Sequence, residues 1–258
     1  MILFSFGCGN NRKKMTMKKS KRYIKYILNR FFPGLICKRE FQTQVFRRFN
    51  ERPIEYAFVF KVISDLYPQK VLDVGTGTTS LPHLIRNCGC LVTAADNIRD
   101  YWSHGMFNRH YYIINDDITE TSLTDSFDLI TCVSVLEHIA KPDDAVRNMF
   151  TLLKGDGYLI LTFPYNESSY IKNVYDLPMA SYGKNAPYIT QSYSRGDLQR
   201  WLKENQAIVV SQEYWQLWTG EYWTQGELVV PPKRTTEKDN HQLTCVLLRK
   251  NSSTTGAL

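Results

Sequence analysis

A glycine-containing turn after an apolar run is the feature that most constrains this chain. The run Val71–Val74 has the pattern of a buried strand, interrupted only by Asp73, and Gly75-Thr76-Gly77 follows it directly. Because glycine accepts positive φ angles, such a turn lets the backbone bend sharply and lets a ligand come close. One of the hydroxyl residues 78–80 can then cap a helix, whose first amide hydrogens suit an anion or a ligand carboxylate.

A second acidic residue follows at the spacing of a nucleotide-binding fold. Leu91–Ala95 is predicted as the next strand, and Asp96 closes it 23 residues after Asp73. In nucleotide-binding α/β folds, an acid that binds ribose follows the glycine turn by about 20 residues. The pair of acids therefore predicts a nucleoside site.

The turn does not fit a dinucleotide. Ser80 stands at the third glycine position of the G-x-G-x-x-G pattern, and no basic residue follows the turn to meet phosphates. Asp73 would repel a pyrophosphate, but it suits a cationic cofactor that has no phosphate. These departures favour a positively charged nucleoside.

At these residues the chain resembles the class I S-adenosylmethionine-dependent methyltransferases, whose first motif reads acid-x-Gly-x-Gly. Four later segments resemble this family in the family's order: Asn115–Thr119 the acidic turn after the third strand, Phe127–Cys132 the fourth strand, Val135–Ile139 the segment behind it, and Leu152–Leu161 the turn into the fifth strand. The resemblance covers roughly residues 68–165. It implies S-adenosylmethionine as the cofactor.

The order of predicted elements gives the fold class. Strands are expected at 70–74, 91–95, 111–114, 127–133 and 158–163, with helices at 79–87, near 98–104 and at 141–154. This alternation predicts an α/β fold with a doubly wound, mostly parallel sheet. Runs 207–215 and 242–249 would complete a seven-stranded Rossmann-like methyltransferase sheet, and the resemblance implies that the last strand is an antiparallel insertion. Residues 216–241 are expected to form a long excursion between these two strands.

The resemblance implies a set of cofactor-binding residues, namely Asp73, Gly75, Thr76, Gly77, Asp96, Asn97, Asp117, Ile118, Cys132 and Val133. The glycines would pass under the methionine part, with Asp73 near its ammonium group. Asp96 would bind both ribose hydroxyls. Asp117 would bind the adenine amino group, with Ile118 against the ring, although Asp116 competes for this role and Asp117 could be only a turn residue. Cys132 and Val133 would lie beneath the sulfur.

His138 is the candidate general base. Methyl transfer to a hydroxyl requires removal of a proton, and an imidazole titrates near neutral pH. The alternative is that Leu136–Ile139 is a structural helix start shared by methyltransferases of different substrates. No metal site is predicted, because no second Cys or His pair stands at a ligand spacing.

The acceptor is expected to be a saccharide or another small molecule with a hydroxyl group. Residues 164–223 are rich in Tyr and Trp, whose flat apolar rings and polar tips suit sugars and aromatic acceptors, although Trp201, in a helix expected over Arg195–Glu204, is assigned to the core. Arg52–Tyr56 resembles a segment of bacterial methyltransferases found with genes for glycan and surface-polysaccharide assembly. This resemblance makes a saccharide hydroxyl the first choice.

Positive charge is concentrated before the glycine turn. Residues 11–50 hold thirteen Lys and Arg against one acid, whereas the rest of the chain holds 19 basic against 24 acidic residues. Within this segment, residues 18–32 predict a basic helix with an apolar stripe, followed by a second helix from about Arg39 to Phe49 and a third after Pro53. The basic helix could bind a membrane surface or cover the cofactor as a lid.

Two other functions remain as alternatives: an RNA methyltransferase whose basic arm contacts phosphates, and a non-catalytic cofactor-binding protein of the same fold. Nucleic acid is disfavoured because the basic residues alternate with apolar ones. The expected organisation is a disordered segment 1–17, a basic helical arm 18–66, a methyltransferase domain 67–250 and a tail 251–258. Scattered cysteines and the lack of a secretion signal predict a cytoplasmic protein, peripheral at the membrane if the arm binds there.

Overall fold

The computed structural model describes residues 34–35, 37–39, 41–46, 50–98, 108–181, 183 and 186–251. Contacts divide the chain into two units, Met1–Arg48 and Phe49–Leu258. The segment 1–17, the basic helix 18–32, most of the helix near 98–104 and most of the tail 251–258 lie outside the described residues.

In the first unit, the described residues between 34 and 42 are helical, and residues 44–46 are not. The helix predicted from about Arg39 to Phe49 is therefore wrong over residues 44–46. Val45 and Phe46 are 69% and 97% exposed, so their apolar side chains gain no packing that would extend the helix.

The second unit opens with α2 (Arg52–Leu66), the helix predicted after Pro53. Pro53 stands in the first turn, where its missing N–H costs nothing, and the helix ends at Tyr67, whose φ of 49° is left-handed. Its apolar side chains, Phe58 and Val62 among them, are buried. The compact unit thus begins before α2, whereas the sequence placed this helix in the arm.

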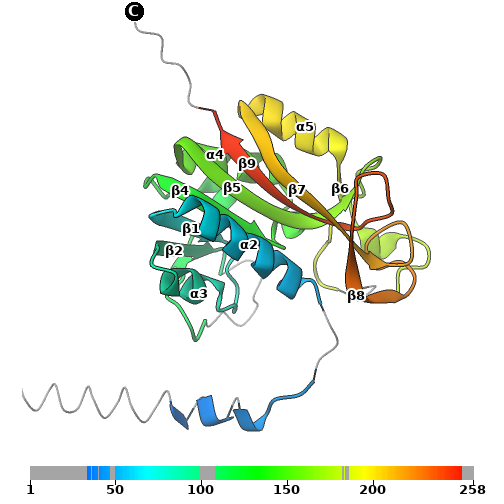
Figure 1. Cartoon of the computed structure of the whole chain (residues 1–258), viewed down its shortest axis with the longest axis horizontal. Coiled ribbons are helices and arrows are strands. Elements are labelled where there is room, and N and C mark those ends of the chain that lie inside the picture. Colours follow the sequence, from blue (N-terminus) through cyan, green and yellow to red (C-terminus); the bar gives the residue numbers. More distant parts are fainter. Residues whose placement is uncertain are drawn as a thin grey trace, which may run out of the picture. The chain divides into compact units, whose positions relative to one another are not determined.

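A single mixed sheet forms the centre of the second unit (Figure 1). Its strands lie in the order β3-β2-β1-β4-β5-β9-β7-β8. Their bounds are β1 Lys70–Val74, β2 Leu91–Asp96, β3 Ile114–Asn115, β4 Phe127–Val133, β5 Leu153–Asn166, β7 Ala207–Trp218, β8 Leu228–Thr235 and β9 Leu243–Lys250. The strands from β3 to β5 pair in parallel, and β9 inserts antiparallel between β5 and β7.

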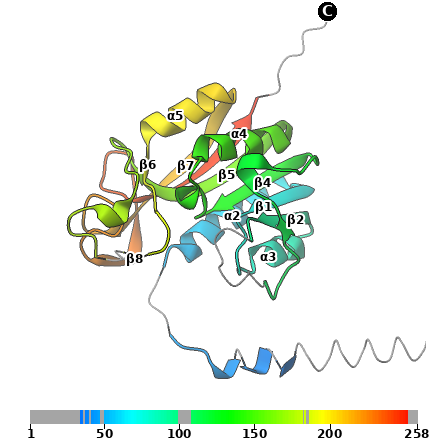
Figure 2. The same cartoon turned by 180° about the vertical axis from the view of Figure 1, so that it is seen from behind.

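Helices cover both faces of the sheet (Figures 1 and 2). The core on one face includes α4 (Pro142–Leu152) and α5 (Arg195–Glu204), and Trp201 of α5 is fully buried there as predicted. The other core includes α2 and α3 (Leu81–Asn87). Alternate residues of β4 serve the two cores, since Ile130 belongs to the first and Leu129 to the second.

The predicted fold class is confirmed, with three differences in detail. The third strand is only Ile114–Asn115 instead of 111–114. Tyr111 contacts β2 through its side chain, since its hydroxyl donates to the Val92 carbonyl at 2.7 Å. The excursion after β7 contains a further strand, β8, which pairs with β7. The short strand β6 (Tyr193–Ser194) adds to the end of β5. No helix among the described residues has the length and apolar character needed to cross a membrane.

Candidate cofactor and acceptor site

The glycine turn lies where β1 ends. Gly75 and Gly77 have φ angles of 72° and 57°, and the Gly75 N–H donates to the Ala95 carbonyl of β2 at 2.8 Å. A Cβ on Gly75 would collide with the side chain of Val135, whereas a Cβ on Gly77 would meet no atom of the described residues within 4 Å. Gly75 is therefore required by packing inside the protein, and Gly77 leaves open space where a ligand can approach the backbone.

Asp73 is buried beneath this turn, with only 2% of its surface exposed. One carboxylate oxygen accepts from Thr131 Oγ1 of β4 at 2.6 Å, and the other accepts from Thr76 Oγ1 at 2.7 Å. Burial raises the pKa of Asp73 to about 6, against the two hydroxyl hydrogen bonds that favour the carboxylate. Asp73 thus holds the turn in place and puts a titratable negative charge below it.

Asp96 lies at the end of β2, beside the open glycine. Its Oδ2 accepts from the Gly77 N–H at 2.7 Å, and burial raises its pKa. Asn108 also holds this turn, because its side-chain amide donates to the carbonyls of Gly77 and Thr79, both at 2.9 Å. The turn and the acid are therefore held in a fixed relation before any ligand arrives.

The two neighbouring acids after β3 face different surroundings. Asp116 is buried, and its oxygens accept from the Thr121 hydroxyl and from the backbone and hydroxyl of Ser122. Asp117 is exposed and accepts from Asn97 Nδ2 at 3.0 Å. Asp117 also caps the short helix η1 (Ile118–Glu120) by accepting from the Thr119 N–H. The carboxylate of Asp116 is already occupied by hydrogen bonds from its own loop, whereas that of Asp117 is exposed beside Asn97. This difference favours Asp117 as the residue that binds a ligand.

Cys132 and Val133 end β4 and are both buried. The next residue, Ser134, has a φ of 49°, and its amide donates to the carbonyl and the hydroxyl of Thr162 on β5. The Ser134 and Thr162 hydroxyls both donate to Glu55 Oε1 at 2.6 Å. Glu55 is fully buried in α2 and pairs with Arg52 at 2.9 Å through its other oxygen. This network fixes the chain where it leaves β4.

His138 and Glu137 follow in the short helix η2 (Leu136–His138). His138 Nδ1 lies 2.7 Å from the Ile189 carbonyl, which can only accept, so Nδ1 carries the hydrogen and Nε2 of the neutral ring carries a lone pair. Burial lowers the pKa of His138, which keeps the ring neutral at neutral pH. Glu137 is 4% exposed, and burial raises its pKa well above its ordinary value.

Residues 41–212 match a family described as "Methyltransferase domain". The match spans more than half of the chain. The chain belongs to this methyltransferase family. The class expected from the sequence, an S-adenosylmethionine-dependent methyltransferase with the class I fold, is thereby confirmed, and the strand order agrees with it.

Two curated relatives are ubiquinone biosynthesis O-methyltransferases. The enzyme of Glaesserella parasuis is 31% identical over 121 residues, which are 43% of this chain and 51% of the relative. The mitochondrial enzyme of Schizosaccharomyces pombe is 29% identical over 131 residues, which are 48% of this chain and 43% of the relative. The matched part of the methyltransferase thus spans about half the length of these relatives.

A solved structure extends the likeness over nearly the whole fold. The 1,6-didemethyltoxoflavin-N1-methyltransferase of Burkholderia thailandensis covers 96% of this chain with a TM-score of 0.53, and 93% of that chain is covered in turn. Its sequence is 14% identical, so the likeness shows a common fold.

A long segment after β5 lies against η2 of the methyltransferase. The Gln191 N–H donates to the Glu137 carbonyl at 2.9 Å, and the Tyr193 hydroxyl donates to the Leu136 carbonyl at 2.7 Å. Tyr188 packs edge-on against the ring of His138, with 4.9 Å between the ring centroids. Tyr188, one of the aromatic residues in the Tyr- and Trp-rich segment 164–223, therefore contacts the candidate base His138. Trp201 of the same segment is buried in the core.

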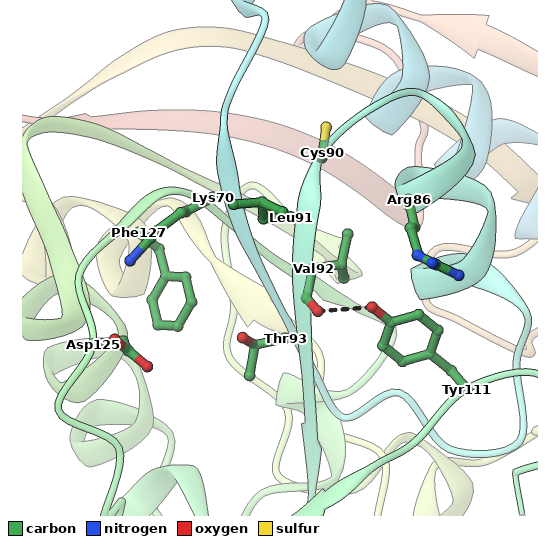
Figure 3. A pocket seen from close by; sticks show the side chains of 9 residues that line it. All are labelled: Lys70, Arg86, Cys90, Leu91, Val92, Thr93, Tyr111, Asp125 and Phe127. Carbon is green, nitrogen blue, oxygen red and sulfur yellow. Dashed lines mark hydrogen bonds between the residues drawn. The ribbon is translucent and has the colours of Figure 1, made fainter. Parts of the chain in front are cut away.

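A shallow cavity at the opposite edge of the sheet is separate from this site (Figure 3). It is lined by the starts of β1, β2 and β4, with Lys70, Arg86 and Asp125 among its charged residues. The glycine turn, Asp96 and His138 all lie at the other ends of these strands or beyond them. We assign no part of methyl transfer to this cavity.

Sequence reasoning missed Asn108, Glu55 and Thr131 in the site. Each acts across the fold, since Asn108 reaches residues 29 and 31 positions away and Glu55 reaches Ser134 and Thr162. No local motif marks them. Glu55 does fall in the segment Arg52–Tyr56, which was noted only for its resemblance to other methyltransferases.

Proposed function

We propose that this protein transfers a methyl group from S-adenosylmethionine to a hydroxyl group of a saccharide or another small molecule. The observation that carries the cofactor assignment is the joined arrangement of the Gly77 amide, the Asp96 carboxylate and the open space over Gly77. The space over the Gly77 backbone lies beside the fixed Asp96 carboxylate. This arrangement fits a nucleoside whose ribose hydroxyls donate hydrogen bonds to that carboxylate.

The remaining cofactor residues take the places implied by the family. Gly75, Thr76 and Gly77 border the methionine part, and the charge of Asp73 below the turn attracts its ammonium group. Asp117, with Asn97 beside it, takes the adenine amino group, and Ile118 packs on the ring. Cys132 and Val133 lie beneath the sulfur of the cofactor. When bound, S-adenosylmethionine supplies an electrophilic methyl group on a sulfonium sulfur.

His138 serves as the general base. With the cofactor bound, Nε2 would take the proton of the acceptor hydroxyl, and the hydroxyl oxygen would take the methyl group that the sulfonium releases. The hydrogen bond from Nδ1 to Ile189 holds the ring in the tautomer that this step needs. The rigid frame around Ser134 keeps the ring close to the cofactor turn, because Val135 touches Gly75.

An oxygen acceptor is supported by the names of the curated relatives, which are O-methyltransferases. A saccharide is the first choice because Arg52–Tyr56 resembles methyltransferases of glycan assembly and because aromatic side chains border His138. We further propose a cytoplasmic protein that needs no metal; among the described residues, no group of three or more Asp, Glu, His or Cys side chains could hold one. The segment 18–32, predicted from the sequence as a basic helix, would bring it to a membrane where lipid-linked sugars are acceptors.

The test is incubation of the protein with methyl-labelled S-adenosylmethionine and a panel of glycans, lipid-linked sugars, small phenols and RNA. We expect label in a saccharide or phenol ether, and no loss of label transfer with a chelator. A His138→Ala variant should lose about 100-fold or more in kcat while it keeps cofactor affinity. Label only in RNA would replace this function with the nucleic-acid alternative. Cofactor binding without transfer to any acceptor would favour a non-catalytic protein.

A further inference from the structure

The side-chain amide of Asn108 uses its full hydrogen-bonding capacity inside the protein. Its Nδ2 donates to the carbonyls of Gly77 and Thr79, both at 2.9 Å. Its Oδ1 accepts from the backbone N–H groups of His110 and Tyr111, both at 2.8 Å. Because the two carbonyls can only accept and the two N–H groups can only donate, this orientation of the amide is the one that satisfies all four. Asn108 therefore joins the glycine turn to the chain segment that leads to β3.

The segment that carries Asn108 is held at a second point on β2. The hydroxyl of Tyr111 donates to the Val92 carbonyl at 2.7 Å (Figure 3). Pairing of β2 with β3 is limited to Ala95 and Asp96, so among the described residues no strand covers the outer side of β2 at Val92. The Tyr111 side chain bonds to β2 where a strand partner would otherwise do so. Asn108 thus approaches the glycine turn from a segment that β2 holds in place.

The backbone at Gly77 depends on such partners for its conformation. Gly77 has a φ of 57° and no side chain whose packing could hold it there, and a glycine populates many other backbone conformations at little cost. Its N–H donates to Asp96 Oδ2 at 2.7 Å, and its carbonyl accepts from Asn108. The carbonyl of Thr79, two residues on, accepts from the same amide. Asp96 and Asn108 therefore fix the exposed backbone of the turn between them.

We propose that Asn108 is a positioning residue for S-adenosylmethionine, which acts by fixing the backbone of residues 77–79 for the cofactor. The inference rests on the proposed cofactor site. The amide of Asn108 has no free donor or acceptor for a ligand, so its contribution passes through the carbonyls of Gly77 and Thr79. A turn that is ordered before the cofactor arrives lowers the entropic cost of binding. Loss of the two donors should therefore weaken cofactor binding in a protein that still folds.

The variant Asn108→Asp separates the two halves of this contact. Its carboxylate can still accept from His110 and Tyr111, but it has no hydrogen for the carbonyls of Gly77 and Thr79 and repels them. Calorimetry with the full-length protein and S-adenosylhomocysteine should show a Kd about tenfold higher than that of wild type, as for the loss of one net hydrogen bond. The number of binding sites per chain should stay at the wild-type value. A merely structural role would instead lower the number of competent sites and leave their Kd unchanged, which would overturn the proposal.

The variant Asn166→Asp is the matched control. Asn166 Oδ1 accepts from the N–H and the hydroxyl of Ser168, at 2.9 and 2.7 Å, so the same substitution changes a similar turn away from Gly77. Its Kd for S-adenosylhomocysteine should stay within twofold of wild type, and a tenfold rise there would overturn the proposal.

A second variant, Asn108→Ala, keeps the test decisive if Asn108→Asp fails to fold. It removes all four hydrogen bonds without adding a charge, and its Kd should also rise severalfold. A wild-type Kd in a folded Asn108 variant would overturn the proposal. The proposed cofactor site is tested separately by Asp96→Ala. If Asp96→Ala weakens binding and the Asn108 variants do not, only the role of Asn108 fails; if none of them weakens binding, the site itself fails.

Discussion

The sheet has a parallel half, β3 to β5, and an antiparallel half that contains β9, β7 and β8. The two halves differ in how they contribute to the candidate site. In the parallel half, β1 and β4 are buried on both faces. The glycine turn follows the end of β1, Asp96 ends β2, and η2 follows the end of β4. In the antiparallel half, residues 208–211 of β7 are exposed. The segment around Gln191, which precedes β6, contacts η2 by a backbone hydrogen bond to Glu137. In the proposed function, strand ends would therefore hold the cofactor, and a segment from elsewhere in the chain would border the acceptor.

Trp201 offers the largest effect with which to test this contrast. It is fully buried against Phe163 and Tyr193, and its indole N–H donates to Asp143 at 2.6 Å. Trp201→Ala should cost about 3–5 kcal/mol of unfolding free energy in urea titrations, from lost burial and the cavity left behind. Trp201→Phe keeps a ring and should cost clearly less. Equal losses in the two variants would assign the effect to the hydrogen bond with Asp143 instead of to packing.

Asp73 should give the parallel half a pH-dependent stability. Its pKa is about 6 in the folded protein against 3.8 unfolded, so the folded state binds more protons between these values. The unfolding free energy should therefore fall as pH rises from about 4 to about 6, by an amount on the order of 3 kcal/mol, and then level off. Asp73→Asn should flatten this slope relative to wild type in denaturant titrations at each pH. If Asp73→Asn showed the same pH dependence of the unfolding free energy as wild type, another buried acid would be its cause.

Asp96→Ala should weaken the cofactor without unfolding the protein. It removes the acceptor of the Gly77 N–H and the charge-assisted hydrogen bonds that we propose to ribose. Calorimetry should show a loss of about 1.5–3 kcal/mol in the binding of S-adenosylmethionine, roughly 10- to 150-fold. Unchanged affinity would remove the basis of the cofactor assignment. Tight binding of NAD instead would place the protein among oxidoreductases.

The adjacent acids Asp116 and Asp117 form a matched pair with opposite expectations. Asp117→Ala should lower cofactor affinity by about 1 kcal/mol and change stability less, because this side chain is exposed. Asp116→Ala should lower stability by about 1–3 kcal/mol, because it leaves Thr121 and Ser122 without their buried acceptor. Thermal denaturation and calorimetry on both variants separate the two roles. The reverse pattern would make Asp116 the ligand group.

The smallest effect is expected on the open part of the antiparallel half. Val210 is 48% exposed on β7. Val210→Thr keeps the branched shape and should change the unfolding free energy by no more than about 0.5 kcal/mol. A loss above 1 kcal/mol in urea titration would show that this strand is covered in solution.

Local signals made the cofactor half predictable. The apolar run before Gly75, the acid at the end of the second run and the order of later motifs all depend on residues close in sequence, and β1, β2, β4 and α4 appear within a few residues of their predicted bounds. The choice between Asp116 and Asp117 could not be made from the sequence. The choice depends on whether each carboxylate points into its loop or towards solvent. Both acids have a threonine nearby that can donate to them, Thr119 for Asp117 and Thr121 for Asp116.

The acceptor half was predicted less well because its contacts are long-range. Nothing near Glu55 in the sequence indicates that it receives hydroxyls from Ser134 and Thr162, and nothing near Ile189 indicates that its carbonyl fixes the tautomer of His138. The strand β8 was missed because Pro231 and Pro232 break its apolar pattern. An edge position, where β8 pairs only with β7, tolerates these prolines.

The place of β9 has a consequence for how the protein is made. β9 leaves the ribosome after both β5 and β7, yet it lies between these two strands and pairs with both over most of its length. Until it arrives, the two strands that flank it have open edges and their apolar side chains lack a neighbour. A nascent chain that stops short of residue 243 therefore carries a complete glycine turn on an unfinished sheet, and such chains are natural substrates for chaperones and proteases.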